Sequence, residues 1–234
     1  MNRRALIICY GLVMAPTLVM AMEAEPNFLF LQANRFEYRA QDGDDSLNWD
    51  VQGWYGGDEQ KLWLKSKGEK NQNGKLEEAE VQLLHSRMVS EFFNLQTGLR
   101  YDDEPGPRRG FAVLGIQGMA PYYLDIDGAV FLSNHGELSA RFSAEYELLL
   151  TQRLILQPAF EVNIAANEVE RRGIGSGVND VELGLRLRYE IRREFAPYIG
   201  VNWLRKLGQT ADFAQADGED AETPSLIAGI RFWF

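Results

Sequence analysis

The final stretch of the chain reads Ser225-Leu226-Ile227-Ala228-Gly229-Ile230-Arg231-Phe232-Trp233-Phe234. Its even-numbered residues are all apolar, whereas its odd-numbered residues mix small, charged and aromatic side chains. Because successive side chains of a β-strand point to opposite faces, one face of this strand is continuously apolar. One interpretation is the edge of a soluble sandwich, which must be covered to prevent aggregation. The other is the closing strand of a transmembrane β-barrel, which has no edge and needs an apolar outer face. The features below favour the barrel.

The first 21 residues are typical of a secretory signal peptide. A short basic start, Met1-Asn2-Arg3-Arg4, precedes an almost uncharged apolar stretch, and small residues around Ala21 suit cleavage. The apolar stretch is shorter than the ~20 residues that a membrane-spanning helix needs. We therefore expect residues 1–21 to be a removed signal peptide, 22–27 a short N-terminal segment and 28–234 the barrel.

Composition narrows the classes of function. Removal of Arg3 and Arg4 with the signal peptide takes the formal net charge from −10 to −12, which argues against a nucleic-acid partner. The single cysteine, Cys9, also lies in the signal peptide. The mature chain is therefore expected to have no disulfide, no thiolate nucleophile and no thiolate metal site.

Period-two alternation recurs along the whole chain, and helical periodicity is nearly absent. Turn signals divide the chain into about twelve strands, and an even number is what a bacterial outer-membrane barrel requires. The predicted fold is thus an all-β, antiparallel transmembrane barrel. The expected strands are 27–41, 47–55, 60–70, 75–87, 90–102, 109–120, 122–133, 137–150, 152–165, 178–192, 195–207 and 225–234.

The lengths of the connections support the same fold. If the N-terminus lies in the periplasm, every second connection is external, beginning with the one after the first strand. These connections are the longer ones, and they include a Gly-rich loop at 167–177 and an acidic loop at 209–223. Short periplasmic turns and longer outer loops are typical of outer-membrane barrels. The topology places the N-terminus and Phe234 at the same rim.

Several stretches together resemble a known family. They are 55–58 (YGGD), 61–65 (KLWLK), 94–102 (NLQTGLRYD), 115–122 (GIQGMAPY), 156–158 (LQP), 184–190 (GLRLRYE), 195–200 (FAPYIG) and 231–234 (RFWF). On these residues the chain resembles the outer-membrane domain of the copper resistance protein B family. The resemblance extends from about Trp49 to the C-terminus.

The resemblance implies a role in copper resistance and homeostasis, by copper binding or export, at the outer membrane of a Gram-negative bacterium. It also implies copper ions, outer-membrane lipid and periplasmic copper-resistance proteins as partners. Many family members carry a Met- and His-rich segment between the signal peptide and the barrel. Here only residues 22–27 intervene, with one Met and no His, so metal sequestration by such a segment is not carried over.

Candidate copper ligands are few. Copper(I) favours thioether and imidazole ligands, whereas copper(II) takes imidazole and carboxylate. The soft candidates in the mature chain are Met22, Met88, Met119, His85 and His135. Parity places His85 on the apolar face of its strand, near the aromatic girdle, and His135 at the tip of an outer loop. A girdle residue and a solvated turn residue are the favoured interpretations of these two.

Parity points Met119 into the lumen near the periplasmic mouth, with Asp125 and Asp127 inward on the next strand. We expect Met119 to lie almost opposite Tyr123, with Asp125 one inward step further along. Met119, Asp125 and Asp127 are therefore the candidate ligands of a weakly bound or transported copper ion. A gap-filling role is the alternative for Met119.

The remaining inward charges are expected to form ion pairs and hydrogen bonds that occupy the lumen, because buried charges need partners. A cation path lined by Asp125 and Asp127 is the alternative. Three functions remain in view: a non-enzymatic copper-handling barrel, a general small porin and an outer-membrane hydrolase. A hydrolase of the Ser-His type needs a histidine beside its nucleophile, and neither His85 nor His135 has an obvious serine partner.

Overall fold

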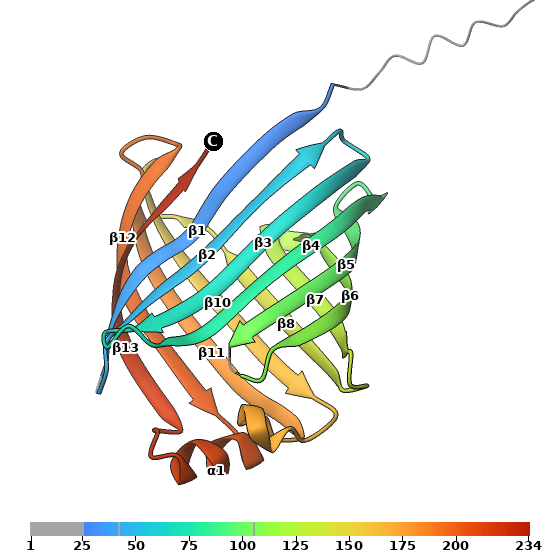
Figure 1. The fold of residues 1–234 in the computed structure, drawn as a ribbon. Helices are drawn as coiled ribbons and strands as arrows, with labels where there is room; N and C mark the ends of the chain where they lie inside the picture. The colour runs from blue at the N-terminus through green and yellow to red at the C-terminus, as the bar shows by residue number, and fades with distance from the viewer. Residues whose placement is uncertain (1–25, 42, 105) are drawn as a thin grey trace, which may run out of the picture.

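The alternating segments pair in chain order into a closed antiparallel barrel (Figure 1). This computed structural model describes residues 26–41, 43–104 and 106–234. The predicted signal peptide and residues 22–25 of the predicted N-terminal segment lie outside the described residues. The strands are β1 (Phe28–Gln41), β2 (Ser46–Gly56), β3 (Gln60–Asn71), β4 (Leu76–Ser90), β5 (Phe93–Glu104), β6 (Arg109–Ala120), β7 (Leu124–Ser133), β8 (Leu138–Tyr146), β9 (Leu148–Leu149), β10 (Leu154–Ala165), β11 (Gly177–Tyr189), β12 (Phe195–Lys206) and β13 (Glu222–Trp233).

The short β9 continues β8 after an interruption at Glu147, and both pair with β10. Counting them as one gives the twelve strands that the sequence predicts. The barrel closes where β1 pairs with β13, and the backbone N–H and C=O groups of Leu31 and Phe234 bond to each other. The prediction that the N-terminal strand and Phe234 meet at one rim is therefore confirmed.

The two ends of the barrel differ. We call the end that carries Phe28 and Phe234 the terminal rim; it also carries the short connections. The opposite end, the loop rim, carries the longer connections, including the 3-10 helix η2 (Glu170–Arg172) and the helix α1 (Gly208–Ala216). Figure 1 shows α1 at the end of the barrel away from the C-terminus. No helix in the described part of the chain is long and apolar enough to cross a membrane.

Side-chain alternation separates the two faces of the wall. On β11, Leu183 and Leu185 are exposed on the outer face, whereas Arg186 and Arg188 are buried in the lumen. A soluble core would show the reverse, so the apolar face is the one available to lipid. The lumen also holds an apolar patch formed by Leu84, Phe111, Val113 and Phe131, with Trp63 and Ala129 packed against it.

Three sequence expectations are wrong in detail. The acidic loop expected at 209–223 holds all of α1 except its first residue, Gly208, and β13 begins at Glu222 rather than Ser225. Tyr122 and Tyr123 do not begin a strand, because they lie in the 3-10 turn η1 (Pro121–Tyr123) with φ values of 67° and 61°. The loop between the paired residues Ala120 and Leu124 therefore has three residues, and the last two adopt the left-handed conformation. Alternation alone does not reveal how many residues such a turn uses.

Candidate functional site

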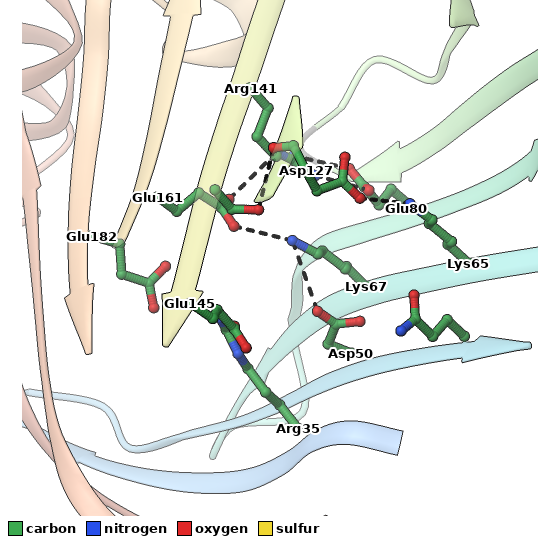
Figure 2. Close-up of polar contacts among 12 residues, drawn as sticks. Arg35, Asp50, Lys65, Lys67, Glu80, Asp127, Arg141, Glu145, Glu161 and Glu182 are labelled. Atoms are coloured by element: carbon green, nitrogen blue, oxygen red, sulfur yellow. Dashed lines mark hydrogen bonds and ion pairs between the residues drawn. The ribbon is translucent and has the colours of Figure 1, made fainter. Parts of the chain in front are cut away.

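A layer of ion pairs crosses the middle of the lumen (Figure 2). Lys67 Nζ on β3 donates to Glu161 Oε2 on β10 at 3.1 Å. These strands are six places apart in either direction around the barrel, so the pair spans its diameter. Arg35 on β1 likewise donates to Glu145 on β8 at 2.7 Å. We call this set, with the Glu80 and Arg141 contacts below, the lumen ion-pair layer.

Glu80 on β4 connects this layer to the wall and to the loop rim. Its carboxylate accepts hydrogen bonds from Arg141 at 3.0 and 3.1 Å and lies 2.8 Å from Arg100. Arg100 also donates to Asp102 at 2.6 Å. Buried charges with several partners of opposite sign form a rigid, satisfied network rather than a free water path. The predicted structural network in the lumen is thus present.

The chain of charges ends beneath a loop at the loop rim. Arg172 of η2 is buried, and its guanidinium donates to Asp102 at 2.7 Å. The loop is held from its other side by α1, since Thr210 accepts a hydrogen bond from the backbone N–H of Gly175 at 2.9 Å. Two connections that are distant in sequence therefore meet over this mouth and place Arg172 inside it.

The terminal mouth contains the predicted ligands. Met119 on β6 lies directly across from Asp125 on β7, and Gln117 lies across from Asp127. The expectation that Met119 faces Tyr123 is wrong, because Tyr123 belongs to η1 and the pairing moves by one inward step. Met119 shares its face with the buried Phe111 and Val113, so its lumen orientation is confirmed.

The two aspartates differ in their surroundings. Asp127 accepts a hydrogen bond from Lys65 Nζ at 2.7 Å, and the same ammonium donates to Gln96 at 3.0 Å. Asp125 has no ion-pair or hydrogen-bond partner among the residues that the structure describes; it lies in register between Met119 and Glu145. A cation at this mouth would meet a free carboxylate at Asp125, whereas at Asp127 it would have to displace Lys65.

Aromatic side chains surround the same mouth on the side of the barrel closure. Phe30 stacks on Trp54 with ring centroids 5.8 Å apart and lies 6.0 Å from Trp233. Lys61 Nζ lies 4.6 Å from the centroid of Trp54. Trp54 on β2 and Trp233 on β13 lie on either side of β1, and the closure between β1 and β13 brings them to the same mouth.

The two histidines lie at opposite ends of the barrel wall and far from the predicted ligands Met119 and Asp125. Within the described ranges, no group of three or more His, Cys, Asp or Glu side chains is arranged to hold a metal ion. The His85 ring is exposed on the outer face and lies 3.3 Å from Gln60 Oε1. The His135 ring contacts Asn134 at the loop rim. Neither imidazole has a hydrogen bond to a serine hydroxyl in the described part of the chain.

Comparison with known proteins assigns the family. The family described as Copper resistance protein B precursor (CopB) matches residues 27–234, almost all of the described chain. The chain belongs to the copper resistance protein B family. Copper resistance protein B of Escherichia coli is 46% identical over 208 residues, which cover 89% of this chain and 70% of the relative. The homolog of Pseudomonas syringae pv. tomato is 44% identical over 205 residues, or 88% of this chain and 69% of the relative.

Among solved structures, this copper resistance protein B family member resembles porins. The NanC porin superposes with a TM-score of 0.55 at 12% identity, covering 88% of this chain and 99% of the porin. The KdgM porin gives a TM-score of 0.52 at 11% identity over the same shares. At these identities the likeness shows the fold alone, a porin-like outer-membrane barrel.

Proposed function

We propose that this chain handles copper ions at the outer membrane of a Gram-negative bacterium, as a non-catalytic barrel. In this proposal the terminal rim faces the periplasm, because short turns on that side are typical of outer-membrane barrels. Family membership supports a role in copper resistance. Binding of copper by the barrel itself is the further step, for which the terminal mouth supplies the candidate ligands.

The observation that carries the proposal is the cross-strand pairing of Met119 with Asp125. A half-exposed thioether lies at the lumen opening together with a carboxylate that has no partner among the described residues. A mixed site of one soft and one hard ligand would hold copper weakly, since neither oxidation state finds its preferred full set. Weak binding suits passage or exchange with periplasmic copper-resistance proteins better than storage. Asp127 would join the site after releasing Lys65.

Copper sensitivity of bacteria tests this proposal. A strain that lacks the native gene is complemented with the wild type or with a Met119→Leu, Asp125→Asn, Asp127→Asn variant, at equal amounts in the outer membrane. We expect the variant to protect less against copper. A control with Asp58→Asn and Asp212→Asn makes the same type of charge change outside the strands and should protect fully. Equal protection by the triple variant would remove these residues from the mechanism.

A general porin is the alternative that the fold similarity favours. The lumen ion-pair layer argues against free passage of solutes, because Lys67 and Glu161 join opposite walls at 3.1 Å. Conductance in planar bilayers separates the two functions. A wild-type barrel with the steady, large conductance of an open porin, together with no copper protection in cells, would favour the porin.

A further inference from the structure

Met88 is a second thioether on the lumen side of the terminal mouth. On β4 the even-numbered residues Glu80, Leu84 and Ser86 are buried in the lumen, whereas Val81 and Leu83 are exposed outside. Met88 continues the even-numbered face. The pairing with β5 shifts immediately after it, between Met88 and Ser90. Such a bulge ends regular pairing and re-aims the side chains beside it.

Register places Met88 close to Met119. Met88 pairs with Asn94 on β5, Asn94 pairs with Gln117 on β6, and Met119 is the next residue on the same face as Gln117. Two strand spacings and two residues of rise give a Cα separation of about 12 Å. The wall is concave toward the lumen, and an unbranched Met side chain has three rotatable bonds. Both thioethers can therefore reach one ion between them.

The exposure of both side chains argues against a packing role. Met88 is 41% exposed and Met119 is 40% exposed, whereas the apolar lumen residues Leu84 and Val113 are 1% and 5% exposed. A methionine that fills a gap in a core is enclosed by its neighbours. The sequence contains six methionines, at positions 1, 14, 20, 22, 88 and 119. The two that belong to the part of the chain described by the structure, Met88 and Met119, both present thioethers on the lumen face of the same rim.

We propose that Met88 and Met119 together bind one soft monovalent cation, copper(I) or silver(I), at the terminal mouth. This inference rests on the proposed function and specifies the charge and softness of the ion. Two thioethers select soft ions over hard divalent ones. Asp125 lies across from Met119 and supplies a negative charge that offsets the charge of the cation. The Asn94 side chain lies on the wall between the two methionines and completes the polar surroundings.

Methyl NMR of the full mature chain in detergent micelles tests the shared site. Methionine is labelled with ¹³C in its methyl group, silver nitrate is the probe, and Met88→Leu and Met119→Leu assign the two signals. We expect both signals to shift with one midpoint at a stoichiometry of one silver ion per barrel. Each single substitution should raise the silver concentration at the midpoint of the other signal at least tenfold, because one thioether ligand remains of two.

Leucine has nearly the volume of methionine, so both variants are expected to fold, and heat-modifiable migration in gels checks that the barrels are intact. Asp180→Asn is the matched lumen control and should leave the silver midpoint unchanged, because Asp180 lies near the loop-rim end of β11, where its carboxylate accepts a hydrogen bond from Asn163. Signals that stay unshifted, or that respond at separate midpoints regardless of the other methionine, would overturn the shared site. If Met88→Leu protects cells against copper fully while Met119→Leu with Asp125→Asn does not, this inference fails and the proposed function stands.

Discussion

Leu185 offers a direct test of which face of the wall meets lipid. It is exposed on the outer face of β11 (Gly177–Tyr189), two residues from the central Leu183. Two residues of rise on a strand tilted by about 45° place Leu185 about 5 Å from the middle of an apolar band ~25 Å tall. An Arg at the midplane of such a band costs about 2–4 kcal/mol. We therefore expect Leu185→Arg to lower the free energy of unfolding in lipid by about 2–3 kcal/mol.

The assay is equilibrium unfolding in urea with phospholipid vesicles, followed by tryptophan fluorescence. Tyr189→Arg is the matched control, because Tyr189 lies on the same outer face at the end of β11. Near the interface the same substitution should cost only about 0–1 kcal/mol. Equal costs at the two positions, or no cost at Leu185, would show that this face does not contact the apolar part of a bilayer.

Two further predictions concern the loop rim. Arg172→Ala should raise the conductance of the barrel in planar bilayers, and unchanged conductance would show that Arg172 does not obstruct the mouth. The same substitution should lower the free energy of unfolding by about 3 kcal/mol, because Asp102 loses a buried partner. The hydrogen bond from Arg109 lowers the pKa of Glu137 below its usual 4.5. The ionised Glu137 carboxylate therefore stabilises the fold above pH 4.5, and this stabilisation is lost as the pH falls through the lowered pKa. Urea unfolding at pH 7 and pH 3 should therefore show a smaller loss of stability on acidification for Glu137→Gln than for the wild type. Equal losses in the two proteins would show that Glu137 does not cause the acid sensitivity.

Much of the fold can be predicted from the alternation of side chains along each strand. Where the structure differs from the sequence prediction, the cause is a local feature of the chain. The sequence predicts the outer face of β11, because apolar residues such as Leu183 and Leu185 alternate without interruption with charged or small residues such as Arg186. The turn at Pro121 shifted the pairing of Met119 because two non-glycine residues adopt positive φ there. The sequence does not predict the helix α1, because its residues belong to an acidic segment with weak apolar periodicity.

The lumen contacts could be predicted only as a class. Alternation shows that Lys67 and Glu161 both point inward, yet their pairing joins residues 94 positions apart across the full barrel. The choice of partner for each lumen charge depends on barrel closure, strand tilt and register. None of these can be predicted from the sequence of a single strand. The same dependence separates the two predicted aspartates, because Lys65 reaches Asp127 from four strands away and does not pair with Asp125.

We propose that this barrel binds copper at the terminal mouth. The most direct measurement is anomalous diffraction at the copper absorption edge from crystals of the mature barrel soaked in a copper salt. The strongest anomalous peak is expected beside Met119 and Asp125, on the lumen face of the terminal rim. A map whose peaks lie only at the loop rim or on the outer wall would contradict the claim.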